Sequence, residues 1–235
     1  MKRLRSLLIV GMALCASLYA PFATALVIGQ SDTFENGTTQ NWVVGLLGAP
    51  HPAPPTNVAD GGPLGAGDNF LRLSSLSGSG SSPGNRLTVL NLSQWAGNYA
   101  TSGISEIAMD LINLGPSDLF IRLYLENPQG APPVDQAITD AAFLPAGGGW
   151  TSTRFSIRSS DLIALTGDLD TLLSNVTVLR IIHGPDEAFP GPSISAILGV
   201  DNITAADGNA IPEPSTLALL AFGLIALRFQ KRKQS

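Results

Sequence analysis

His183, Asp186 and Glu187 stand close together in the chain. Because histidine titrates near neutral pH, this group could transfer protons or hold a metal ion. The only other histidine, His51, stands in a proline-rich stretch, and the sequence contains no nucleophile elbow, zinc-type histidine pair or phosphate-binding glycine loop. A lone histidine at a strand end is ordinarily structural. We therefore predict no catalytic residues and no enzymatic activity.

Two aromatic residues, Trp95 and Tyr99, lie in the polar segment 93–99. Exposed aromatic rings of this kind can stack on the apolar face of a sugar. The pair is thus the candidate ligand-binding site, and the alternative is that both rings pack over the edge of the folded domain.

The segments that must position these residues alternate between apolar and polar side chains, a period typical of half-buried strands. Glycine, proline, serine and asparagine separate them. The expected strands cover 69–73, 86–92, 107–112, 119–126, 150–157, 176–182 and 197–204. We expect 107–112 and 119–126 to form an antiparallel hairpin around the turn 113–118, and 161–165 and 169–173 to form short helices. This pattern predicts an all-β protein, a two-sheet antiparallel β-sandwich.

Charge is distributed unevenly along the chain. Residues 1–25 carry three basic side chains and residues 214–235 carry four, with no acidic residue in either segment. Residues 26–213 contain six arginines, no lysine and 18 acidic residues, a net charge of −12. Nucleic acid is excluded as a partner, because phosphate binding requires a basic surface. An acidic domain suits cations, neutral sugars or simple solubility.

The N-terminus has the pattern of a secretory signal peptide. Basic residues precede an apolar stretch, and Ala23 and Ala25 form a small-residue cleavage site, which gives a signal peptide over residues 1–25. Cys15 is the only cysteine and falls within this peptide. The mature chain is therefore expected to be exported and to fold without a disulfide.

The C-terminus combines a proline-rich stop, an apolar run and a basic tail. Pro212 and Pro214 flank Glu213 and end the folded part of the chain, so the expected domain covers 26–210 and the tail 211–235. A transmembrane helix is predicted at about 216–229, short for a bilayer but extended by basic residues that can snorkel. The basic tail predicts a cytoplasmic C-terminus. It consists of Arg228, Lys231, Arg232 and Lys233.

This order of Pro212-Glu213-Pro214, apolar helix and basic cluster closely resembles the PEP-CTERM sorting signal of Gram-negative bacteria. The resemblance implies an inner-membrane intermediate, cleavage by an exosortase-type protease near the Pro-Glu-Pro motif, and release to the cell surface or the extracellular matrix. It also implies exopolysaccharide as a partner, since such proteins are associated with bacteria that produce it.

The two ends of the domain resemble galactose-binding-like jelly rolls, a superfamily with many carbohydrate-binding modules. The likeness is carried by the opening segment 32–42 (Asp-Thr-Phe-Glu-Asn-Gly-Thr-Thr-Gln-Asn-Trp) and the closing segment 198–203 (Leu-Gly-Val-Asp-Asn-Ile). Members often hold one structural calcium ion where the first and last strands meet. By this resemblance Glu35 and Asp201 are the expected ligands, with Asp32 a weaker third. The alternative is that these acids are hydrogen bonded without a metal.

Three functions remain open from sequence. The first is an exported domain that binds glycan or exopolysaccharide, the second a structural or protein-interaction sandwich without sugar binding, and the third a glycan-active enzyme. The first is favoured, and the third has the least support.

Overall fold

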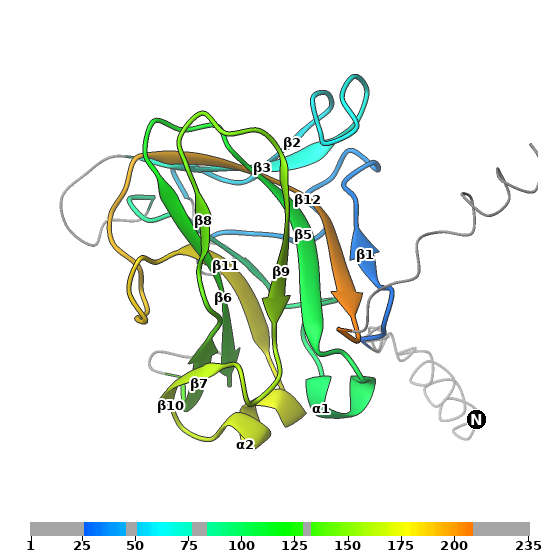
Figure 1. Ribbon diagram of the computed structural model, residues 1–235, viewed down its shortest axis with the longest axis vertical. Helices are drawn as coiled ribbons and strands as arrows, with labels where there is room; N and C mark the ends of the chain where they lie inside the picture. The colour runs from blue at the N-terminus through cyan, green and yellow to red at the C-terminus, as the bar shows by residue number, and fades with distance from the viewer. Residues whose placement is uncertain (1–25, 46–50, 77–83, 129–132, 209–235) are drawn as a thin grey trace, which may run out of the picture.

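The computed structural model describes residues 26–45, 51–76, 84–128 and 133–208. Two antiparallel β-sheets pack face to face, as Figure 1 shows. The fold therefore confirms the predicted two-sheet antiparallel β-sandwich.

The first sheet, called sheet A, has the strand order β2-β3-β12-β5-β9. A further strand, β1, pairs with the C-terminal half of β12, where Asp32 lies opposite Ile203. The first and last strands thus meet, as the jelly-roll resemblance implied. The bounds are β1 (Ser31–Asp32), β2 (Thr56–Val58), β3 (Phe70–Ser75), β5 (Glu106–Asn113), β9 (Thr151–Ser156) and β12 (Ala196–Ala206).

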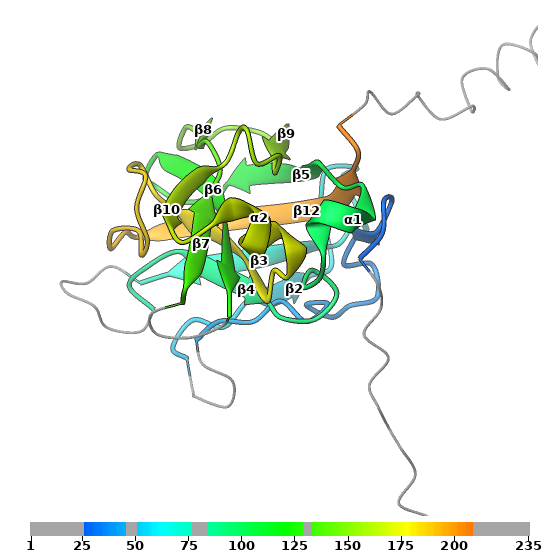
Figure 2. The same cartoon turned by 90° about the horizontal axis from the view of Figure 1, so that it is seen from below.

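The second sheet, sheet B, has the order β10-β7-β6-β11-β4, and β8 pairs with the N-terminal part of β6. In sheet A the strand β9 pairs only with β5, so β8 and β9 lie at sheet edges on the same side of the sandwich (Figures 1 and 2). The bounds are β4 (Thr88–Asn91), β6 (Leu119–Asn127), β7 (Asp135–Ile138), β8 (Ala142–Leu144), β10 (Ile163–Thr166) and β11 (Val178–His183).

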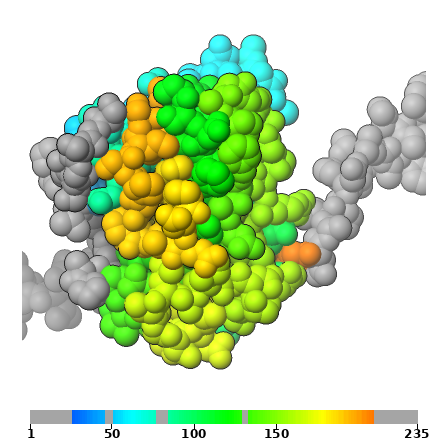
Figure 3. Space-filling view, turned by 60° about the vertical axis from the view of Figure 1, so that its left-hand side comes forward, coloured from blue at the N-terminus to red at the C-terminus, as the bar shows by residue number. Residues whose placement is uncertain are grey.

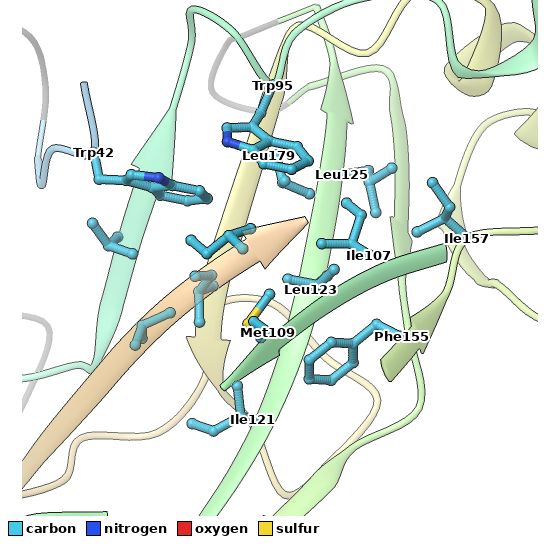
Figure 4. Packing of buried hydrophobic residues seen from close by; sticks show 14 of the residues in the cluster. Trp42, Trp95, Ile107, Met109, Ile121, Leu123, Leu125, Phe155, Ile157 and Leu179 are labelled. Atoms are coloured by element: carbon cyan, nitrogen blue, oxygen red, sulfur yellow. The ribbon is translucent and has the colours of Figure 1, made fainter. Parts of the chain in front are cut away.

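The core fills the space between the sheets, because each strand turns its apolar side chains inward. In β5 burial alternates residue by residue, which confirms the predicted alternation of Ile107, Met109 and Leu111. These side chains meet Ile121, Leu123 and other apolar residues of sheet B in one continuous cluster, part of which Figure 4 shows.

The predicted hairpin of 107–112 and 119–126 is wrong. These segments are β5 and β6, and they belong to opposite sheets. The turn between them crosses the sandwich and is held by Asn113, whose side-chain amide donates to the carbonyls of Ser117 (2.8 Å) and Leu144 (3.0 Å). A hairpin and a crossing both turn alternate apolar residues toward the core, so the pattern alone did not distinguish them.

Two short helices lie at one end of the sandwich and contact each other (Figure 2). They are α1 (Tyr99–Ser102) and α2 (Leu169–Ser174). Asp168 caps α2 by accepting a hydrogen bond from the backbone N–H of Thr171 (2.8 Å), which confirms the helix predicted over 169–173. The helix predicted over 161–165 is wrong, because residues 163–166 extend as β10 and pair with β7.

One buried carboxylate joins three distant segments beside the core. Oδ2 of Asp32 accepts hydrogen bonds from the indole N–H groups of Trp42 (2.8 Å) and Trp95 (2.7 Å), and both indoles are fully buried. The two rings lie 6.5 Å apart, between centroids. Burial raises the pKa of Asp32, while the hydrogen bonds from both indoles and from Gln94 lower it. We call this group the Asp32 junction.

We expect Asp32→Ala to lower the free energy of unfolding by about 2–4 kcal/mol, since two buried indole donors lose their acceptor. Urea unfolding followed by tryptophan fluorescence measures the change. Asp161→Ala is the matched control, because that carboxylate also accepts two side-chain hydrogen bonds, from Ser156 and Ser160, but is fully exposed. It should leave stability nearly unchanged, and equal losses in the two variants would contradict the role given to the junction.

Candidate functional site

Trp95 and Tyr99 do not form an exposed platform. Their side chains are 0% and 3% exposed, and the Tyr99 hydroxyl donates to the carbonyl of Trp95 (2.9 Å). The polar residues around them form the turn before α1 and its cap, where Asn98 accepts from the N–H of Thr101 (2.9 Å). Both rings point into the protein instead. The prediction that this pair stacks on sugar is therefore wrong.

Asp32 is also wrong as a metal ligand. Its Oδ2 accepts from two indoles, and the side-chain amide of Gln94 donates to both of its oxygens, at 3.2 and 3.0 Å. With these donors the carboxylate is already satisfied inside the protein.

The other two expected ligands, Glu35 and Asp201, belong to a group of four carboxylates. The group, called the acid corner, consists of Glu35, Asp68, Asp110 and Asp201. Asp201 is 1% exposed and accepts a hydrogen bond from the N–H of Asn202 (2.7 Å). Burial, followed by the negative charges of Asp68, Asp110 and Glu35, raises the pKa of Asp201 to about 7.

Among the residues that the structure describes, the acid corner accepts hydrogen bonds from neutral donors. The N–H of Asn69 donates to Glu35 (2.9 Å), and the side-chain amide of Asn202 donates to Asp110 (2.9 Å). No basic side chain in the described part of the chain forms an ion pair with these acids. The corner thus concentrates negative charge that the surrounding protein leaves uncompensated.

The acid corner matches the needs of a hard cation only in part. Within residues 26–208, gaps excepted, no three His, Cys, Asp or Glu side chains lie close enough together to hold a metal ion. A cation here would take two carboxylates and complete its shell with carbonyl and water oxygens. Calcium accepts such a shell, because it binds six to eight oxygens in flexible geometry.

His183 has a structural role. It is 5% exposed, and its Nδ1 accepts a hydrogen bond from the N–H of Phe120 (3.1 Å). Burial lowers its pKa. Asp186 and Glu187 are exposed in the following loop. This arrangement agrees with the structural interpretation of the histidine.

The loop between β11 and β12 covers part of the outer face of sheet B. Phe189 stacks on Tyr124 with ring centroids 4.0 Å apart and an angle of 14° between the rings, and Tyr124 is fully buried. Arg180 lies beside both rings and pairs with Glu126 (2.6 Å). Figure 3 shows the loop, in gold, on the surface of the domain. Tyr124 is therefore covered rather than solvent-facing.

An open hollow of about 280 Å³ lies at the edge of the sandwich, where the connection from β7 to β8 faces β9. Its lining combines two aspartates, a threonine, a serine and one arginine with two alanines and Phe155. We call it the edge hollow. The lining residues are Thr139, Asp140, Ala141, Ala142, Arg154, Phe155, Ser156 and Asp161.

Charged groups of the edge hollow are held in place by neighbours. Arg154 pairs with Glu106 of the adjacent strand (2.6 Å). Asp161 accepts hydrogen bonds from the hydroxyls of Ser156 (2.6 Å) and Ser160 (2.7 Å), which lower its pKa and keep it ionised. Asp140 is exposed. The hollow thus offers two aspartates and one paired cation.

An exposed aromatic residue follows this lining in the chain. Phe143 directly follows Ala142 of the lining and is 54% exposed, more than any other aromatic side chain in the described residues. Because successive strand residues point to opposite faces, its ring lies on the outer face of sheet B, 5.1 Å from the ring of Phe120. The ring thus points to the opposite face from Ala142 and forms an exposed apolar platform on the outer face of sheet B.

Sequence reasoning missed this site. Phe143 stands in the run Ala-Ala-Phe-Leu, where Leu144 is buried, and no pattern in so short a run shows which ring faces water. Arg154 and Asp161 are far from Asp140 in sequence and meet only through the fold. A charged residue on an edge strand, such as Arg154 in 150–157, was the one signal available.

Several predictions fall on residues outside the described part of the chain. These are the signal peptide over 1–25, with its cleavage residues Ala23 and Ala25, and the whole tail from 211 to 235 with its Pro-Glu-Pro motif, helix and basic residues. Among the residues that the structure describes, no helix has the length and apolar character to cross a bilayer. The predicted span at 216–229 is not among them.

Comparison with known proteins identifies the tail. Residues 210–233 match the PEP-CTERM protein-sorting motif, as the sequence predicted. Such a motif implies export, membrane-associated sorting and processing by an exosortase. No curated protein matches the chain.

Among solved structures, an exo-beta-agarase resembles 82% of this chain with a TM-score of 0.52 and 12% identity, and this likeness shows a shared fold. The chain spans only 26% of the agarase. A family 11 carbohydrate-binding module from Clostridium thermocellum, in complex with a beta-1,3-1,4-mixed-linked tetrasaccharide, has a TM-score of 0.47 at 16% identity, over 77% of this chain and 96% of the module. The CBM22-1 xylan-binding domain from Paenibacillus barcinonensis has a TM-score of 0.43 at 15% identity, over 79% of this chain and all of that domain.

The sorting motif and the fold together describe this protein. The protein is an all-β, two-sheet sandwich followed by a PEP-CTERM protein-sorting motif at residues 210–233.

Proposed function

We propose that this protein is an exported cell-surface or matrix protein whose sandwich domain binds glycan at the edge hollow and has no catalytic activity. The observations that carry the proposal are a hollow lined by Asp140, Arg154 and Asp161, and the exposed ring of Phe143, which follows the lining residue Ala142 in the chain. The sorting motif supports the destination. Exopolysaccharide outside the cell is the glycan that a protein so sorted would meet.

Sugars present two kinds of surface, and the site has a counterpart for each. The apolar C–H face of a pyranose ring packs on an aromatic ring, as Phe143 would allow. Hydroxyl groups at the ring edge donate to carboxylates and accept from a guanidinium, so Asp140, Asp161 and Arg154 would fix orientation. A hollow of about 280 Å³ is close to the lower limit of ordinary ligand pockets, a size that suits one sugar unit of a longer chain.

Sorting would precede binding. By this proposal the tail enters the inner membrane, and an exosortase-type protease cleaves near Pro212, Glu213 and Pro214. The sandwich would then reach the cell surface without its basic tail.

We expect Phe143→Ala to weaken binding about tenfold, because an aromatic contact contributes roughly 1–1.5 kcal/mol. Affinity electrophoresis of the purified protein in gels that contain agarose, xylan, mixed-linkage glucan or bacterial exopolysaccharide measures retention. Circular dichroism establishes that the variant is folded.

Leu64→Ala is the control for this experiment. Leu64 is 88% exposed in the loop between β2 and β3, so the change also removes an exposed apolar side chain. Retention should be unaffected. If Phe143→Ala behaves like Leu64→Ala, the edge hollow is not the site. If folded protein is retained by no glycan, a structural or protein-interaction role replaces the proposal.

We also propose that one calcium ion stabilises the acid corner, with Glu35 and Asp201 as ligands. The uncompensated charge around Asp201 supports it, because a divalent cation would relieve the repulsion from Asp68 and Asp110. Calcium should raise the melting temperature of the wild type. At a hundredfold excess over its dissociation constant, binding adds about 2.7 kcal/mol to the free energy of unfolding. Asp201→Ala should abolish the shift in differential scanning fluorimetry. If millimolar calcium causes no shift in melting temperature, the calcium proposal is wrong.

In the presence of a chelator the same residue makes stability depend on pH. A carboxyl whose folded pKa is about 7 binds a proton on folding, so stability falls as pH rises from about 4 to 7 and stays low above that range. Asp201→Asn removes the charge and should be more stable than the wild type by about 4 kcal/mol at pH 8, at roughly 1.36 kcal/mol for each unit of the raised pKa. The difference should vanish near pH 4 in urea titrations. A difference that is constant with pH would rule out Asp201 as its source.

A further inference from the structure

The charge of the edge hollow restricts the kind of glycan that fits. Its lining includes two acidic residues, Asp140 and Asp161, and one basic residue, Arg154. The guanidinium group of Arg154 forms an ion pair with Glu106, with 2.6 Å between Nη1 and Oε1, and the Glu106 side chain is 16% exposed. The two lining carboxylates therefore act on a ligand without a free cation beside them.

Neighbouring basic residues do not change the negative net charge of the edge hollow. Arg158 follows β9 and acts weakly on Asp161, but its guanidinium group lies beside Gly208, at the end of the described chain. Asp161 stays ionised because the hydroxyls of Ser156 and Ser160 donate to it. With Arg154, Glu106 and Arg158 all counted, the site remains negative.

The whole domain reinforces the local charge. Residues 26–213 contain six arginines, 18 acidic residues and no lysine. Such a domain produces a negative potential that attracts cations and repels anions over a Debye length of about 8–10 Å. An anionic polymer, such as a chain of uronic acids, would meet repulsion both from the domain and inside the hollow.

Resting on the glycan-binding proposal, we infer that the ligand of the edge hollow is an amino sugar with a protonated amine, in a polymer with free amino groups. An ammonium group donates up to three hydrogen bonds and forms charge-assisted contacts with carboxylates. Asp140 and Asp161 are its acceptors. An N-acetylated sugar of the same backbone brings no charge and forms only neutral hydrogen bonds.

Two oligosaccharides with the same backbone test the inference. Hexamers of glucosamine and of N-acetylglucosamine are titrated into the purified full-length protein by isothermal calorimetry, at fixed salt and about pH 5.5, where the amines are protonated. We expect the amine form to bind at least tenfold more tightly. Equal affinity for the two hexamers would overturn the amine preference and leave glycan binding intact.

A matched pair of variants separates the site from the general charge of the domain. Asp140→Asn and Asp170→Asn each remove one exposed negative charge, the first in the hollow and the second on α2. Asp140→Asn should weaken binding of the glucosamine hexamer at least fivefold, and Asp170→Asn less than twofold. Equal losses would show diffuse attraction and overturn the site.

The general binding screen distinguishes failure of the inference from failure of the proposed function. Retention on neutral polysaccharide, lost in Phe143→Ala, together with no preference for amines, would contradict only the ligand class. Binding of neither hexamer and of no polysaccharide would contradict both proposals.

Discussion

Asp32 is the residue on which the N-terminal part of the sandwich depends. Its carboxylate lies at the first strand, and the two indoles bound to it come from Trp42, 10 residues later, and Trp95, 63 residues later. Gln94 adds two further contacts and also donates to the carbonyl of Gln40 (2.6 Å). Because the acceptor is fixed on β1, which pairs with β12, the junction ties the first and last strands to the segment before α1.

The junction also accounts for unusual backbone geometry. Phe34, Gln40 and Asn41 have positive φ angles, which side-chain-bearing residues rarely adopt. The side chain of Gln40 accepts from the N–H of Phe34 (2.7 Å), and Phe34 is fully buried. Tight turns of this kind bring Trp42 back toward Asp32 within 10 residues. Their strain is offset by burial of two indoles and a phenylalanine.

Two buried aspartates near β12 show how surroundings decide the role of an acid. Asp32 receives three side-chain donors, which offset part of the effect of burial, although its pKa remains raised. Asp201, buried to a similar degree, has Asn202 as its donor and three carboxylates nearby. The donors that Asp32 needs all come from the protein. The repulsion around Asp201 falls when the carboxylate binds a proton or a cation, so pH and metal ions should affect Asp201.

The sequence contained enough information for seven of the strands, namely β3, β4, β5, β6, β9, β11 and β12, but not for the shorter ones or for the strand partners. Alternation in 107–112 and 119–126 shows which side chains face the core, and both segments are strands with those faces inward. Their assignment to opposite sheets depends on contacts with β12 and β11, far away in the chain. Likewise the polar residues around Trp95 indicated exposure, whereas the ring itself is drawn inward by Asp32, an acceptor 63 residues away.

The position of the edge hollow follows from the same dependence on distant contacts. Edge strands such as β9 expose unpaired backbone groups and tend to attract other strands, and charged side chains on them prevent this. Arg154 on β9, paired with Glu106 of β5, is such a charged side chain. Asp161 and Asp140 add negative charge beside this edge. Groups that keep the edge from pairing with another protein also leave it hydrated and rich in hydrogen-bonding capacity. A sugar can use such an edge where a strand cannot, because it binds through scattered polar contacts and one ring face rather than through a continuous ladder.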